Sequence, residues 1–202
     1  MRSTKPDIFL GRQPIFDRAG RIAAYELLYR SDGERNTAHV DDDAVATAHV
    51  VSCAFRTLGI EAVVGRPKAF INVDAEFLLS GRIDALPRER IALEILETTE
   101  IDEHVLRRCR QLKARGFILA LDDFSCDDAL HDQILDIVDI VKIDLMRLDQ
   151  ASLSALVARL KIRPITLLAE KVDTADRLRA CFSLGFDLFQ GFAVGHPVVL
   201  AA

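Results

Sequence analysis

The chain has 202 residues, of which 50% are hydrophobic and 28% charged, and its formal net charge is −5. This length favours one compact domain over residues 1–202, and an acidic chain without an overall positive field is not expected to bind DNA through its phosphates. No apolar run approaches the roughly 18 residues that span a bilayer, and no signal peptide is recognisable. The four cysteines form no C-x-x-C pair. A cytoplasmic protein with reduced thiols, not associated with a membrane, is therefore expected.

The first thirty residues predict a β-hairpin. Segments 8–16 and 21–30 have the composition of strands, and the residues between them, DRAG at 17–20, suit a tight turn. These two strands should therefore be antiparallel. Acids at 41–43 then precede an apolar stretch that ends at Gly59, a pattern typical of a capped helix.

From residue 68 onwards, strand-like and helix-like segments alternate. The strand-like runs lie at 68–72, 91–96, 117–122, 139–144, 165–170 and 187–191, and helical segments lie at 104–116, 152–162 and 174–185. Strands separated by helices imply right-handed crossovers and a parallel sheet. With the hairpin, about eight strands result, which predicts an α/β fold of the (β/α)8 barrel type. An open doubly wound sheet is the alternative, because the chain is shorter than the about 250 residues typical of such barrels.

Polar side chains fall at the ends of these strands. They are Glu26 in the hairpin, Asn72, Glu94, Glu97, Asp122, Asp123, Lys142, Asp144, Glu170 and Gln190. In a parallel barrel these positions converge at the C-terminal mouth, where active sites of this fold lie. Gathered carboxylates are costly unless they are neutralised, and carboxylate and amide oxygens prefer hard cations such as Mg²⁺, Mn²⁺ or Ca²⁺.

The adjacent acids Asp122 and Asp123 are the most informative pair. Because side chains alternate along a strand, both can reach the mouth only where the backbone turns. Two cations about 4 Å apart would then activate a water and stabilise the attacking and leaving oxygens of a phosphodiester, and Lys142 would hold that water or offset charge. Taken singly, the two acids would fit a turn or helix cap and Lys142 a solvated strand end. Polar residues at six successive strand ends favour a site.

These residues also carry a family pattern: the chain resembles the EAL domain, the bacterial cyclic di-GMP phosphodiesterase family, from about Ile8 to Pro197. The motif E-A-L-x-R appears as ELLYR at 26–30, N-L-S as NVD at 72–74, E-x-T-E as EILE at 94–97, D-D-F unchanged at 122–124, K-x-D as KID at 142–144, A-E-G-V-E as AEKVD at 169–173 and Q-G-Y as QGF at 190–192. Each motif is weak alone, but seven in order are a strong signal.

The resemblance implies a modified, TIM-like (β/α)8 barrel with an antiparallel first strand. It implies Mg²⁺ or Mn²⁺, in a one- or two-metal site, on residues matching Glu26, Asn72, Glu94, Asp122 and Asp123. By the same resemblance, Lys142 and Glu170 would be catalytic residues near the attacking water, Arg30, Leu28, Gln190 and Asp144 would contact the cyclic di-GMP ligand, and Glu97 would support the active-site loop. Many members of this family dimerise, so a homodimer is a further expectation.

The departures from the family pattern leave the activity open. The family loop D-D-F-G-T-G is here DDFSCD at 122–127, so both glycines are lost, and Lys171 and Leu96 replace a glycine and a threonine. The sequence also resembles the branch normally fused to a C-terminal HDOD domain, and no such domain is recognised in these 202 residues. One hypothesis is a phosphodiesterase that yields the linear dinucleotide pGpG. Another is a degenerate, inactive receptor or scaffold for an HDOD domain or protein partners. A barrel lyase or racemase with Lys142 as base fits the strand ends but not the ordered motifs.

Overall fold

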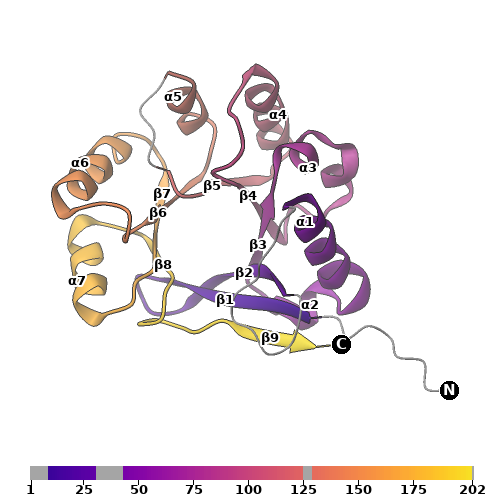
Figure 1. Cartoon of the computed structure of the whole chain (residues 1–202), viewed down its shortest axis with the longest axis horizontal. Helices are drawn as coiled ribbons and strands as arrows, with labels where there is room; N and C mark the ends of the chain where they lie inside the picture. The colour runs from indigo at the N-terminus through magenta and orange to yellow at the C-terminus, as the bar shows by residue number, and fades with distance from the viewer. Residues whose placement is uncertain (1–8, 31–42, 125–128, 202) are drawn as a thin grey trace.

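The strands form a closed barrel, which the computed structural model describes for residues 9–30, 43–124 and 129–201 (Figure 1). The strands are β1 (Phe9–Asp17), β2 (Ile22–Arg30), β3 (Lys68–Val73), β4 (Ile91–Ile95), β5 (Ile118–Leu121), β6 (Ile140–Asp144), β7 (Thr166–Glu170), β8 (Leu188–Phe189) and β9 (Val198–Ala201). Strands β2 to β8 pair side by side in chain order and in parallel, and β1 closes the ring. The predicted barrel is thereby confirmed.

Strand β1 is antiparallel to each of its partners. It pairs with β2 through the predicted hairpin, with β8 at its C-terminal end, and with β9 near its N-terminal end. Because β1 joins β2 to β8, the sheet has no gap at this point, and the open doubly wound alternative is wrong. The modified barrel with an antiparallel first strand is confirmed.

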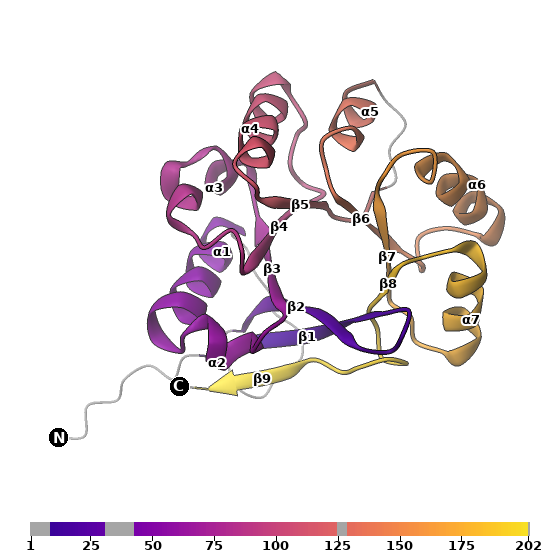
Figure 2. The ribbon, with the colours of Figure 1, turned by 180° about the vertical axis from the view of Figure 1, so that it is seen from behind.

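Helices cover the outside of the barrel except beside β1, where β9 takes their place (Figures 1 and 2). The helices are α1 (Asp43–Ser52), α2 (Ile60–Val64), α3 (Ala75–Leu79), α4 (Glu103–Ala114), α5 (Ala129–Leu135), α6 (Gln150–Leu160) and α7 (Ala175–Leu184). Side chains of Asp102, Asp149 and Thr174 accept backbone N–H bonds at the starts of α4, α6 and α7, which explains where these helices begin. Within the described residues, no helix is both long and apolar enough to cross a membrane.

Several local elements differ from the expectations. The helix expected to end at Gly59 is split, because α1 ends at Ser52 and continues as a π-helical turn, Cys53–Thr57. Gly59, at φ +83°, then separates this turn from α2. Helices α2, α3 and α5 and the last strand, β9, were not predicted. The acids at 41 and 42 and loop positions 125–127 lie outside the described residues.

Candidate functional site

A small apolar cluster fills the inside of the barrel. It consists of Ile15, Ala24, Phe70, Ala92, Ala120, Ile140 and Leu168, with Leu188 packed against it. Because successive side chains on a strand alternate between faces, the residue two positions later points into the barrel again. On the successive strands these later positions hold Glu26, Asn72, Glu94, Asp122, Lys142, Glu170 and Gln190. An apolar floor is thus followed by one polar layer at the mouth.

Lys142 lies at the centre of this polar layer. Its Nζ atom forms an ion pair with Glu94 and lies 2.9 Å from Glu170 Oε1, 3.2 Å from Asp122 Oδ1 and 3.9 Å from Glu26 Oε1. The Lys142 side chain is 1% exposed. Burial alone would lower the pKa of Lys142, but the four carboxylates outweigh it and raise that pKa, so the ammonium stays charged. One cation is shared by four acids.

Burial makes several of the acids hold protons more tightly than usual. Desolvation raises the pKa of Glu94 well above its ordinary value, although Lys142 opposes this. It also raises the pKa of Glu170 to about 7, against the pull of Lys142, and that of Asp123 to about 6, where Asp122 adds to the effect. These acids therefore keep protons at pH values at which exposed carboxyl groups are ionised.

Some oxygens at the barrel mouth accept hydrogen bonds, and others accept none within the described residues. Glu26 accepts from Asn72 Nδ2 at 3.3 Å and from Gln190 Nε2 at 2.6 Å. Within the described part of the chain, the buried atoms Asn72 Oδ1, Gln190 Oε1, Glu94 Oε2 and Asp123 Oδ1 have no hydrogen-bond partner. Buried polar atoms are rarely left unsatisfied. Unsatisfied carboxylate and amide oxygens are the ligands that a hard divalent cation prefers, so the donor set fits such a cation.

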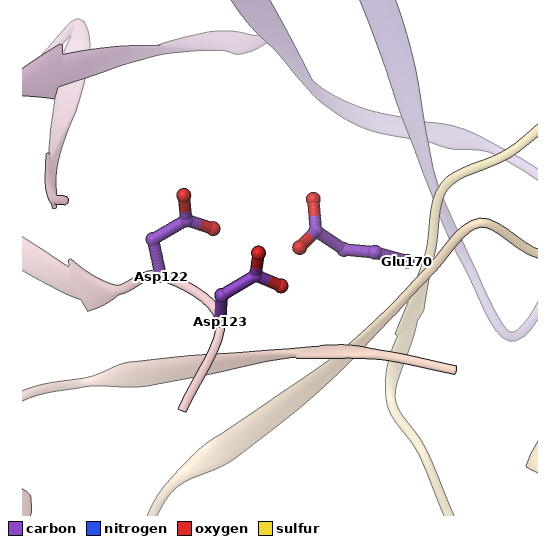
Figure 3. A group of neighbouring side chains, drawn as sticks. All are labelled: Asp122, Asp123 and Glu170. Atoms are coloured by element: carbon purple, nitrogen blue, oxygen red, sulfur yellow. The ribbon is translucent and has the colours of Figure 1, made fainter. Parts of the chain in front are cut away.

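The two adjacent acids reach the mouth together. Strand β5 ends at Leu121, and Asp123 has a φ of +42°, in the left-handed region, so the backbone turns between the two side chains. Oxygens of Asp122, Asp123 and Glu170 lie within 4.8 Å of one another (Figure 3). The predicted turn at the strand end thus places both carboxylates on the same side.

Two further cations lie on the Asp123 side of the layer, and the sequence did not single out their pairing. Arg147, in the turn after β6, pairs with Glu97, lies 3.1 Å from Asp123 Oδ2 through Nη2, and lies 3.6 Å from Asp144 Oδ2 through Nε. Lys171 pairs with Asp144 and has a φ of +53°, unusual for a side chain of its size. The pairing with Glu97 raises the pKa of Arg147, and the pairing with Asp144 raises the pKa of Lys171. Both cations are therefore fixed in the charged form.

The predicted ligand contacts on β2 lie apart from these ion pairs. Arg30 is buried, its Nη1 donates to the Tyr29 carbonyl at 2.8 Å, and its Nε has no partner among the described residues. Burial lowers the pKa of Arg30, and the nearby charge of Glu26 offsets part of that effect. Leu28 is half-buried on the same strand. Arg30 is thus a buried cation with a spare donor.

A cavity of about 280 Å³ opens beside the polar layer. Its lining residues are Gln13, Glu26, Glu170, Lys171, Asp173, Gln190, Gly191 and Phe192. Gln13 was not predicted, and the only signal for it is its position opposite Glu26 in the β1–β2 register. The cavity places the polar layer within reach of a ligand.

Comparison with known proteins settles the family. The family model of the EAL domain matches residues 67–197. This chain belongs to the EAL domain family. The cyclic di-GMP phosphodiesterase CdgJ of Vibrio cholerae is 35% identical over 196 residues, covering 95% of this chain and 45% of that protein. The uncharacterised protein YuxH of Bacillus subtilis is 32% identical over 198 residues, covering 96% of this chain and 48% of that protein. This EAL domain thus spans less than half the length of both relatives.

Solved EAL structures share the fold. Bacillus subtilis YkuI, in complex with cyclic di-GMP and calcium, superposes with a TM-score of 0.73 at 20% identity, covering 95% of this chain and 56% of that one. Klebsiella pneumoniae BlrP1, in a complex with manganese and cyclic di-GMP, gives 0.72 at 22% identity, covering 98% and 58%. At these identities the likeness supports the barrel architecture of the EAL domain.

Proposed function

We propose that this EAL domain binds cyclic di-GMP and a divalent cation, Mg²⁺ or Mn²⁺, at the barrel mouth and hydrolyses one phosphodiester bond to release pGpG. The observation that carries the proposal is the polar layer around Lys142, in which four carboxylates share one ammonium group and buried oxygens lack donors. The cyclic di-GMP phosphodiesterase that matches 95% of this chain supports the choice of substrate.

The residues of the layer have distinct roles in this proposal. Glu26, Asn72, Glu94 and the adjacent acids Asp122 and Asp123 would hold the cation through oxygen atoms. When bound, the cation supplies a Lewis acid that lowers the pKa of water and polarises the phosphodiester. Gln190 would keep Glu26 oriented through its hydrogen bond.

Glu170 is placed to accept the proton of the attacking water, because its carboxylate lies at the mouth within 4.8 Å of oxygens of Asp122 and Asp123. In the proposed step the water oxygen bonds to phosphorus while its proton passes to Glu170, the bond from phosphorus to the 3′ oxygen breaks, and that oxygen takes a proton from solvent and leaves as a hydroxyl. Lys142, 2.9 Å from Glu170, would offset the negative charge that develops on the phosphate. Arg30, with its spare donor, would contact a phosphate of the ligand.

The test is incubation of the purified domain with cyclic di-GMP and Mg²⁺ or Mn²⁺, with the products separated by chromatography. We expect pGpG from the unaltered chain, none from Glu26→Ala, and unchanged product from Glu89→Ala, a surface acid whose side chain is 67% exposed. Intact cyclic di-GMP after long incubation of the unaltered chain would refute hydrolysis.

A second candidate function is a nucleotide receptor or protein-interaction domain without turnover. It is favoured by the pairing of Asp123 and Asp144 with cations of the chain itself, Arg147 and Lys171. Equilibrium dialysis of cyclic di-GMP without formation of product would support this role. Homodimerisation and contact with an HDOD domain remain predictions, which light scattering of this chain alone and with such a domain would test.

A further inference from the structure

We propose that Arg147 takes the place of a second divalent cation, so that this chain binds one such cation at the mouth instead of two. The inference rests on the proposed function, because it assumes that the polar layer binds a divalent cation. It concerns how many cations bind and which residue sets that number.

The acids at the mouth divide into two groups with different charge balance. The inner group is Glu26, Glu94, Asp122 and Glu170, whose four carboxylates share the ammonium of Lys142. When all of these are ionised, the inner group has a formal charge of −3.

The outer group is Asp123, Asp144 and Glu97, whose three carboxylates pair with Arg147 and Lys171. Its formal charge is −1. A divalent cation therefore gains much more attraction from the inner group than from the outer one.

The geometry of the Arg147 side chain suits it to take the place of a second divalent cation. Its guanidinium contacts all three outer carboxylates, at 3.1 Å from Glu97 Oε1 and Asp123 Oδ2 through Nη2 and at 3.6 Å from Asp144 through Nε. A guanidinium is always charged and its planar donors suit carboxylates, so one side chain can link acids that a second metal ion would otherwise bridge. A second ion placed among these three outer carboxylates would lie close to this guanidinium and be repelled by it.

Asp123 remains able to serve the inner group. Its Oδ2 faces Arg147, whereas its buried Oδ1 has no hydrogen-bond partner within the described residues. Its carboxylate also belongs to the set of oxygens within 4.8 Å shared with Asp122 and Glu170. One cation bound by the inner group can thus take Asp123 Oδ1 without displacing Arg147.

The test counts bound Mn²⁺ by isothermal titration calorimetry and records its electron paramagnetic resonance spectrum. We expect one tight Mn²⁺ and a mononuclear spectrum for the unaltered chain. In Arg147→Met, affinity for a second Mn²⁺ should rise by at least about tenfold, with a spin-coupled spectrum from two neighbouring ions. Arg147→Lys, which keeps the charge, should retain one ion.

Arg163→Met is the matched control, because Arg163 also pairs with two carboxylates, Asp132 and Asp136, outside the mouth. It should bind one Mn²⁺. Two tight ions in the unaltered chain, or one ion in both the unaltered chain and Arg147→Met, would overturn the inference while leaving the proposed function in place. Absence of Mn²⁺ binding to the unaltered chain would overturn both. Since the Arg147 side chain is 46% exposed, circular dichroism should show that its variants fold.

Discussion

Replacing Lys142 with methionine tests how strongly the polar layer depends on its buried ammonium. The Lys142 side chain is 1% exposed and that of its partner Glu94 is fully buried. Removing one member of a buried ion pair costs about 3–5 kcal/mol. A separate route gives a similar figure: protonating one carboxyl of ordinary pKa 4.5 at pH 7.5 costs three pH units, or about 4 kcal/mol.

The assay is urea and thermal unfolding in EDTA at pH 7.5 and at pH 5.5. At pH 7.5 we expect Lys142→Met to lose about 4 kcal/mol, which for a chain of this size lowers Tm on the order of 10 °C. At pH 5.5 the same protonation costs only one pH unit, so the loss should shrink to about 1.4 kcal/mol. Excess Mn²⁺ at pH 7.5 should restore part of the lost stability, because it neutralises the same carboxylates.

Lys113→Met is the control, because Lys113 forms an ion pair with Asp139 and its side chain is 41% exposed. Exposed pairs contribute at most about 1 kcal/mol, so this variant should change little at either pH. A loss below about 1 kcal/mol in Lys142→Met at pH 7.5, or a loss that does not depend on pH, would show that the four carboxylates are not held together by this ammonium.

Three further predictions concern the same region. Without metal, Glu170 has a pKa of about 7 in the folded state and an ordinary pKa of 4.5, so the free energy of unfolding should fall as the pH rises between these values. Urea titrations of Glu170→Gln should show a flatter dependence of that free energy on pH. An unchanged slope would count against the assignment. Lys171 has a φ of +53°, a left-handed backbone conformation that glycine adopts without strain. Lys171→Gly should therefore be more stable to urea than Lys171→Met by about 1 kcal/mol, although both variants lose the ion pair with Asp144. Equal stability of the two variants would argue against backbone strain. Gly191 has a φ of +146°, and a Cβ atom added at this position would collide with the backbone of Val172. In calorimetry, Gly191→Ala should therefore lower Tm far more than Gly20→Ala, where an added Cβ meets nothing within 4 Å. Similar Tm values for the two variants would contradict this.

The barrel could be predicted because its signals are local. Alternating strand-like and helical runs gave a parallel sheet, and the DRAG turn at 17–20 gave the antiparallel first strand, as the pairing of β1 confirms. Strand β9 could not be predicted in the same way, because it is four residues long and its pairing with β1 joins segments nearly the whole chain apart. The π-helical turn after α1 likewise follows no pattern in the sequence.

The polar layer was predictable for a related reason. Apart from Glu26, which lies in the middle of β2, its members lie within two residues of the C-terminal end of a strand. Parallel strands of a barrel bring such positions together whatever the loops do. Arg147 was missed because its contact with Asp123 depends on the turn after β6. Gln13 was missed because its position opposite Glu26 depends on the register of the β1–β2 hairpin. The functional roles of these residues stay predictions.

The two halves of the mouth have been altered to different extents. The inner group keeps every carboxylate of the family pattern, whereas the sequence departures at Leu96 and Lys171 adjoin residues of the outer group or pair with them. Lys171 replaces a glycine and adds a positive charge next to Asp144, the residue that Arg147 also approaches. Charge has thus been added where a second cation would bind and left unsatisfied where the first would bind. The proposed binding of a cation with nucleotide and the proposed hydrolysis can therefore be tested separately in this domain, and the residues proposed for binding the cation are retained in the chain.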